Sequence, residues 1–334
     1  MFIVENYSLA ILFCSITMLC WGSWANTQKL ATGKWRYELF YWDYVWGIFL
    51  FAIISALTMG STGDQGRGFI ADIQQASASN MTSAFIGGVI FNLANILLTS
   101  AISIAGMSVA FPIGIGIALI LGVVVNYIGV QKGDPILLFA GAFLITVAIV
   151  LNAMAYRKAS SEAAQKTSKK GIVLSIIAGV LMSFFYRFIA IAMDLENFVD
   201  PAPLKMTPYS AFVVFGIGIL ISNLFFNTIM MKKPLEGPPL TYKMYFNGRF
   251  SLHLIGIFGG AIWGLGNLFN LLAAGKAGPA ISYGLGQGAT LVAAVWGVLV
   301  WKEFKHAKTN VNGLLIGMFV CFIVGLAFII RSGA

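Results

Sequence analysis

Two charged side chains stand inside long apolar stretches of this 334-residue chain and are its first candidates for chemistry. Asp43 lies about 10 Å into one stretch and Arg187 about 9 Å from the end of another, at 1.5 Å per residue. Ionisable groups are costly in hydrocarbon and usually face a polar interior. We expect Asp43 to bind and release a proton; a structural hydrogen-bonding role is the alternative. Arg187 could face a solute cavity, pair with Asp43 or extend to the interface.

Amide and aromatic side chains form a second group of candidates. Trp263, Asn267 and Asn270 are spaced to share one helix face, as are Asn92 with Asn95 and Tyr283 with Gln287. Such groups suit neutral polar solutes through hydrogen bonds and stacking, although asparagines also hold membrane helices together. The predicted solute-binding residues are Trp21, Trp24, Asn26, Asn92, Asn95, Arg187, Trp263, Asn267, Asn270, Tyr283 and Gln287.

Motifs for metal, nucleotide or covalent chemistry are absent from the sequence. The three cysteines and two histidines lack metal-ligand spacing, and neither G-x-x-x-x-G-K-[ST] nor H-E-x-x-H occurs. We therefore predict no metal site, no cofactor and no ATP-driven motor. An intramembrane enzyme or a non-transporting membrane receptor is the alternative from another class.

The composition places these candidates in a membrane. Apolar residues make up 59% of the chain and charged residues only 10%, which excludes a soluble enzyme or a nucleic-acid-binding protein. Spans must be helical, since lipid offers no partners to backbone groups. The sequence thus predicts an all-α polytopic membrane protein with ten transmembrane helices. These lie near 7–28, 37–60, 82–101, 107–129, 135–156, 171–193, 208–231, 253–274, 279–301 and 311–331.

The basic residues predict how the ten helices are oriented. Of 21 Lys and Arg, 15 fall in loops on one side, including the segment 157–170. Basic loops stay in the cytoplasm, so the +9 net charge records topology. We expect a multi-pass protein of the cell membrane with both termini on the non-cytoplasmic side.

An internal repeat divides the chain into two halves. At a shift of 172 residues, Gly87-Gly88 aligns with Gly259-Gly260, and Asn95 aligns with Asn267. Each half holds five spans, and an odd number inverts the second half relative to the first. We therefore predict two inverted five-helix repeats, residues 1–156 and 171–334, joined by a basic linker at 157–170. Inverted repeats are typical of secondary transporters that bind solutes near the membrane midplane.

Several segments taken in order resemble the drug/metabolite transporter superfamily, and within it the ureide permeases and the bacterial glucose/ribose and rhamnose porters. They are Trp21-Gly-Ser-Trp24, Tyr41-Trp-Asp-Tyr44, Gly87-Gly88 with Asn95, Tyr245-Phe-Asn-Gly-Arg249, Gly266-Asn267 and Trp296-Gly297. The resemblance implies uptake of a solute, commonly driven by protons, and favours Asp43 and Asn267 as functional positions. Tyr186-Arg187 departs from the small or proline residues expected there and could signal an anionic solute group.

Together these observations predict a proton-coupled importer of a small polar organic solute, such as a sugar or a ureide- or nucleobase-like compound. The expected partners are that solute, protons and the lipid bilayer. Multidrug or metabolite efflux is the alternative within the superfamily.

Overall fold

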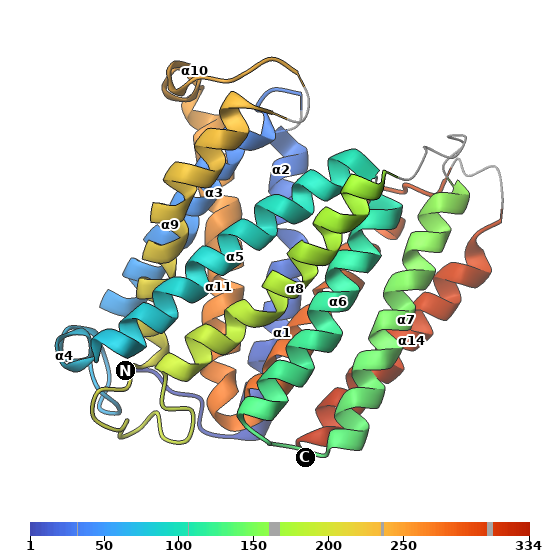
Figure 1. Ribbon diagram of the computed structural model, residues 1–334. Coiled ribbons are helices and arrows are strands. Elements are labelled where there is room, and N and C mark those ends of the chain that lie inside the picture. The colour runs from blue at the N-terminus through green and yellow to red at the C-terminus, as the bar shows by residue number, and fades with distance from the viewer. Residues whose placement is uncertain (32, 106, 160–167, 235–236, 306–309) are drawn as a thin grey trace.

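The computed structural model describes all residues except 32, 106, 160–167, 235–236 and 306–309, and it is a bundle of long helices (Figure 1). The helices are α1 (Tyr7–Ser23), α2 (Ala25–Ala31), α3 (Tyr37–Leu57), α4 (Phe69–Gln75), α5 (Ala78–Ala105), α6 (Met107–Gly129), α7 (Pro135–Ala159), α8 (Lys169–Ala192), α9 (Pro208–Lys232), α10 (Tyr242–Phe246), α11 (Phe250–Ala277), α12 (Pro279–Gln287), α13 (Ala289–Val295), the π-helix η1 (Trp296–Val300) and α14 (Asn312–Ser332). Ten helical segments of the described chain are long and apolar enough to span a membrane, which confirms the predicted number. Of the predicted linker 157–170, residues 160–167 lie outside the described residues.

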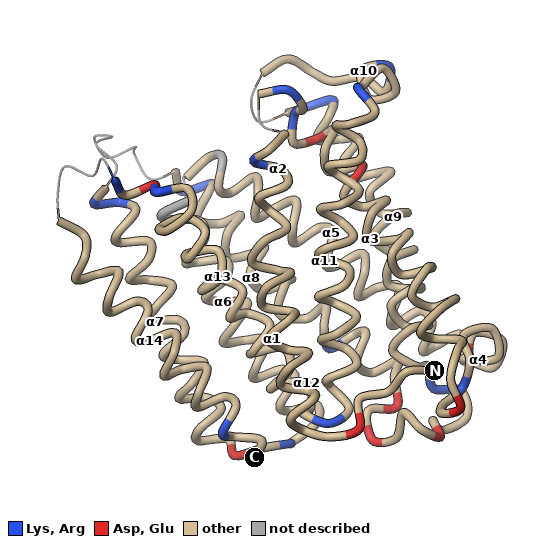
Figure 2. Tube along the Cα trace, turned by 180° about the vertical axis from the view of Figure 1, so that it is seen from behind, with Lys and Arg blue, Asp and Glu red and all other residues tan. Residues whose placement is uncertain are grey.

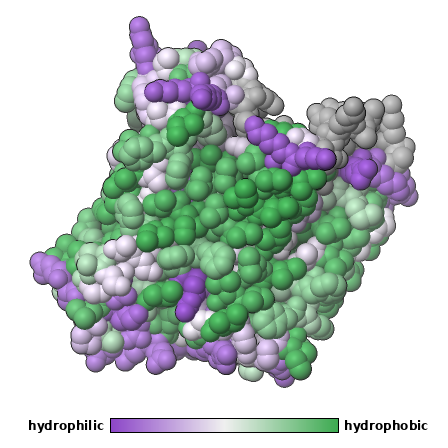
Figure 3. Space-filling view, in the orientation of Figure 1, coloured by the Kyte–Doolittle hydropathy of each residue, from purple (hydrophilic) through white to green (hydrophobic). Residues whose placement is uncertain are grey.

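On the face of the bundle that Figure 3 shows, apolar side chains form a band between two polar ends. Both termini lie at one end, which we call the terminal face; it also holds Asp194–Lys205. The opposite end, the basic face, holds the α2–α3 turn, α10 and the segment Trp301–Lys305. Lys and Arg gather at the basic face, whereas Asp and Glu gather at the terminal face (Figure 2). This polarity agrees with the distribution of charge predicted for the loops.

Two of the ten spans are interrupted helices, which the sequence did not predict. The first span is divided between α1 and α2 at Trp24, and the ninth between α12 and α13 at Gly288. The ninth span then ends in the π-helix η1, a form that often occurs near functional sites. Trp24 and Gly288 keep right-handed helical backbone angles, so each interruption is a local break in the helix and not an unwound segment.

The helices pack in pairs that correspond when the first five spans are exchanged with the last five. The contact of α5 with α8 matches that of α1 with α11, and α5 with α9 matches α3 with α11. The contact of α6 with α8 likewise matches that of α1 with α12 and α13, whereas the α7–α14 and α3–α9 pairs each map onto themselves. This correspondence supports the two-repeat organisation; the inverted repeat and its boundaries stay predictions.

Glycines aligned by the repeat lie at corresponding helix crossings. A Cβ on Gly88 of α5 would overlap the carbonyl oxygen of Phe215 on α9. A Cβ on Gly260 of α11 would likewise overlap the carbonyl oxygen of Tyr44 on α3. Without a hydrophobic driving force between helices in lipid, such close backbone packing is a main source of association.

We predict that Gly88→Ala and Gly260→Ala each destabilise the protein, because the added methyl group forces two backbones apart. Overpacking of this kind costs about 1–3 kcal/mol. Gly313→Ala is the control, since no described residue outside its own stretch of helix comes within 4 Å of a Cβ built there. Thermal unfolding in detergent should show a lower midpoint for the first two variants only; equal midpoints for all three would contradict the packing argument.

Candidate functional site

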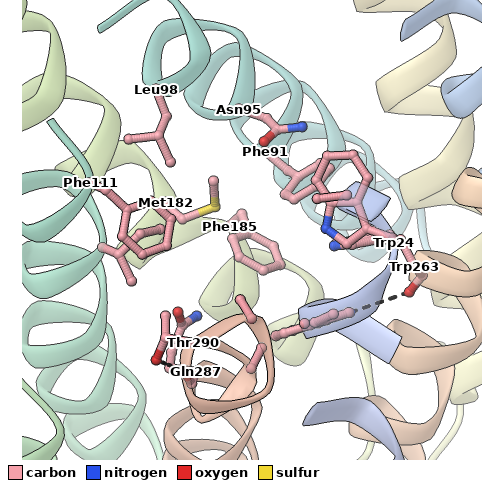
Figure 4. Close-up of a pocket in the computed structure, with 16 residues that line it drawn as sticks. Trp24, Phe91, Asn95, Leu98, Phe111, Met182, Phe185, Trp263, Gln287 and Thr290 are labelled. Carbon is pink, nitrogen blue, oxygen red and sulfur yellow. Dashed lines mark hydrogen bonds between the residues drawn. The ribbon is translucent and has the colours of Figure 1, made fainter. Parts of the chain in front are cut away.

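A cavity of about 230 Å³ lies between the interrupted spans and helices α5, α6, α8 and α11. Six of its 16 lining residues are aromatic (Figure 4). They are Trp21, Trp24, Phe91, Phe111, Phe185 and Trp263. Three polar side chains, Asn95, Gln287 and Thr290, also line the cavity, and no charged residue does so among the described ones. The cavity therefore offers flat apolar surfaces with a few hydrogen-bonding groups.

The aromatic wall is fixed by stacking between the two halves of the chain. Trp21 stacks on Trp263 with ring centroids 5.7 Å apart, and the Trp21 indole nitrogen donates to the Trp263 carbonyl oxygen at 3.3 Å. Phe91 packs on Trp263 at 4.4 Å, and these two residues are aligned by the 172-residue repeat. Because these rings hold one another, their exposed faces are preorganised for a flat ligand.

Tight packing of the two interrupted spans places Trp21 beside the cavity. A Cβ on Gly22 of α1 would overlap the carbonyl oxygen of Ala289 and the side chain of Val292, at the start of α13. A Cβ on Gly286 of α12 would press on the Trp21 ring. The small residues near both interruptions thus let α1 and the ninth span cross closely enough to share one wall.

The polar side of the cavity is backed by a chain of hydrogen bonds. Asn95 donates from Nδ2 to the Tyr41 hydroxyl at 3.1 Å, and Tyr41 donates to Asn92 Oδ1 at 2.9 Å. Asn92 then donates to the Ser222 hydroxyl at 2.9 Å on α9. Oδ1 of Asn95 is therefore the acceptor, and the second N–H of Nδ2 a donor, that this side chain can offer to a ligand.

A layer of tyrosines closes the cavity toward the terminal face. Tyr186 and Tyr283 are fully buried, with ring centroids 5.5 Å apart. The Tyr283 hydroxyl lies 3.0 Å from the carbonyl oxygen of Ala118 and 3.3 Å from that of Met182, and the Tyr186 hydroxyl donates to the Asn270 carbonyl oxygen. These contacts join α6, α8, α11 and α12 on that side of the cavity.

Of the eleven predicted solute-binding residues, five line this cavity. They are Trp21, Trp24, Asn95, Trp263 and Gln287. Asn26 lines a neighbouring cavity, and Asn92 stands behind Asn95. Asn267, Asn270 and Tyr283 are fully buried outside the cavity lining. No amide atom of Asn267 has a hydrogen-bond partner among the described residues.

Arg187 and Asp43 lie near opposite ends of the bundle and contact different residues. Arg187 packs across Gly129 at the terminal-face end of α6. Asp43 is buried near the basic face, where Oδ1 bonds to the Tyr245 hydroxyl at 2.6 Å and to His253 Nδ1 at 2.8 Å. Its Oδ2 accepts from the Trp35 indole at 3.0 Å. Asp43 and Arg187 do not pair in this structure.

Sequence reasoning missed several residues of the cavity wall. Phe91, Phe111, Phe185 and Met182 line the cavity but were not predicted, and neither was Thr290. A phenylalanine in an apolar span looks the same in sequence whether it faces lipid or solute. For Phe91 a signal was available, because the repeat aligns it with the predicted Trp263.

Comparison with known proteins identifies the family. The profile of the ureide permease family matches residues 40–170 and 157–332. The chain belongs to the ureide permease family. Ureide permease 1 of Arabidopsis thaliana is 24% identical to this chain, with 99% of each protein covered. The "Probable glucose uptake protein GlcU" of Priestia megaterium is 27% identical over 68% of this chain and 71% of its own length.

A solved structure shares the fold. One crystal structure aligns with a TM-score of 0.61 at 13% identity, over 97% of this chain and 96% of the other. Family and fold together make the chain a multi-pass membrane transporter for small polar solutes. Its relatives are permeases and uptake proteins, which points to transport and not catalysis.

Proposed function

We propose that this permease imports an uncharged polar solute, either a sugar or a ureide- or nucleobase-like compound, across the cell membrane by alternating access. The cavity carries this proposal: it combines six aromatic side chains with Asn95, Gln287 and Thr290, and no charged residue among the described ones lines it. A planar ureide or nucleobase would stack on the indole faces and bond to the amides through its N–H and C=O groups. A sugar would place its C–H faces on the same rings and its hydroxyls on the amides.

The charge asymmetry supports an orientation of the protein in the membrane. We assign the basic face to the cytoplasm, since cytoplasmic loops carry an excess of Lys and Arg, and both termini then lie outside. The tyrosine layer at Tyr186 and Tyr283 closes the outer side, and the cavity adjoins a second one toward the basic face. In this assignment the cavity lies on the cytoplasmic side of the tyrosine layer.

Uptake by purified protein in liposomes tests this function. We expect saturable uptake of at least one of D-glucose, allantoin and uracil, the probes for the three solute classes. Liposomes without protein are the background. Absence of flux for a wide panel of sugars, ureides and nucleobases would exclude the proposed substrate classes, and export of an apolar drug would favour efflux instead.

We predict that Asn95→Ala weakens binding of the transported probe, because the cavity loses its Oδ1 acceptor. Loss of one hydrogen bond costs about 1 kcal/mol, roughly a fivefold rise in Kd. Ligand-dependent thermal stabilisation measures the change. Asn152→Ala is the matched control, since Asn152 lies on α7 and lines no described cavity. Equal losses in both variants would argue against a binding role for Asn95.

Asp43 is our candidate for the proton-coupling group. It is a buried carboxylate that is hydrogen-bonded by Trp35, Tyr245 and His253. A proton between Asp43 Oδ1 and His253 Nδ1, which are 2.8 Å apart, can reside on either atom. Burial and the contact with Asp43 raise the pKa of Tyr245, which keeps this phenol a donor. Asp43 adjoins Tyr44, whose ring packs at 4.5 Å on the cavity residue Trp24, and this contact could transmit protonation to the solute site.

We predict that Asp43→Asn abolishes accumulation of the probe against its gradient but leaves exchange of labelled for unlabelled probe intact. Accumulation needs a group that changes protonation, whereas exchange needs only the solute site. Liposomes with an imposed pH gradient separate the two modes. Glu38→Gln, one turn away on α3 and paired with Arg36, is the control. Undiminished pH-driven accumulation in Asp43→Asn would rule out this role.

A further inference from the structure

A second cavity of about 180 Å³ lies between the solute cavity and the basic face. Three small residues, Gly22, Ala25 and Ala293, line both cavities, so the two are contiguous. The chemistry changes from one to the other. The solute cavity has no charged lining residue among those described, whereas Lys29 and Glu303 line the second cavity.

An ion pair crosses the second cavity. Lys29 Nζ on α2 lies 2.7 Å from Oε1 of Glu303, which follows η1 in the chain. The Tyr156 hydroxyl on α7 donates to the other carboxylate oxygen of Glu303. Lys29 also lies 4.2 Å from the centre of the Trp301 ring. Three segments that are far apart in sequence are thus joined at one carboxylate.

The segment that presents Glu303 is anchored to the first span by two indoles. Trp296 donates to the Ser23 hydroxyl at 2.9 Å, and Trp301 donates to Asn26 Oδ1 at 2.7 Å. Lys302 has a φ of 52°, in the left-handed region that side-chain-bearing residues rarely adopt. This turn directs the chain back so that the Glu303 amide donates to the Gly297 carbonyl oxygen at 3.0 Å.

The charge state of the pair is set by its surroundings. Burial favours a higher pKa for Glu303, but the hydrogen bonds from Lys29 and Tyr156 and the Lys29 charge outweigh burial and hold the pKa below its usual value. The carboxylate is therefore ionised at neutral pH. Side-chain exposure of 43% for Lys29 and 33% for Glu303 makes this a weak pair that can break and reform.

We propose that Lys29, Tyr156 and Glu303 form the gate through which solute leaves the cavity toward the basic face. The inference rests on the proposed transport function. The ion pair joins α2, which begins directly after the interruption at Trp24, to the segment that follows η1 at the end of the ninth span. A solute with hydroxyl or amide groups can replace either partner as the pair opens, because Glu303 accepts hydrogen bonds and Lys29 donates them.

The gate can be tested without any solute. Ala293→Cys, in a protein whose Cys14, Cys20 and Cys321 are replaced by alanine, places one thiol on the wall shared by both cavities. Membrane vesicles are treated with a membrane-impermeant maleimide, and Lys305→Cys in a separate sample marks which preparation exposes the basic face. We expect Lys29→Gln and Glu303→Gln each to raise the labelling rate of Ala293→Cys about threefold, as for a weak ion pair.

Non-additivity decides whether the two residues act through one bond. The double variant should label no faster than the faster single variant, because either change already removes the pair. Lys305→Gln, an exposed lysine of the same segment, should leave labelling unchanged. Unchanged labelling in both single variants of a protein with its normal thermal midpoint, or two effects that multiply, would overturn the gate. Absent solute flux with the expected labelling would instead reject the proposed function and keep the gate.

Discussion

The structure depends on the close approach of helix backbones at a few glycines. In lipid there is little hydrophobic free energy to gain when apolar side chains of two helices come together, because lipid tails are equally apolar. Tight packing must therefore hold the bundle together. Gly88 lets α5 rest on α9, and Gly260 lets α11 rest on α3. Each glycine is followed one turn later by an aromatic cavity residue, Phe91 or Trp263. The crossings therefore fix not only the bundle but also the depth and rotation of the side chains that line the cavity.

From those crossings follows a cavity with rigid walls and few polar groups. The rings of Trp21, Phe91 and Trp263 hold one another, and Asn95 is held by Tyr41. The tyrosine layer seals one side, while the contact between the halves on the other side includes an ion pair with substantial exposure. This asymmetry is what alternating access requires, because one side must be tightly packed while the other can open.

Polar residues in the spans serve different purposes that their types do not reveal. Asn95 and Gln287 face the cavity, whereas Asn270 donates to the Ser282 carbonyl oxygen between α11 and α12. The depth of Asp43 in the span made it a candidate proton-binding group in the sequence. Its three hydrogen-bond partners are Trp35, Tyr245 and His253, of which only Trp35 is near in sequence. Their convergence on one carboxylate depends on how the α10 segment folds back over α3.

The sequence by itself determined the ten spans, the membrane setting, the clustering of basic residues and the class of protein, because each depends on composition or on local order along the chain. The helix periodicity also placed Trp263 of α11 and Asn95 of α5 among the candidates, and both line the cavity. Only the tertiary structure decided which of them meet, since the hydrophobic effect does not distinguish the lipid-facing side of a span from its packed side. Rotation about each helix axis is set by contacts between distant segments, as at Gly260 against Tyr44 and Lys29 against Glu303. For that reason Asn267, which was predicted to bind solute, is buried outside the cavity lining, whereas Phe91, which was not predicted, lines the cavity.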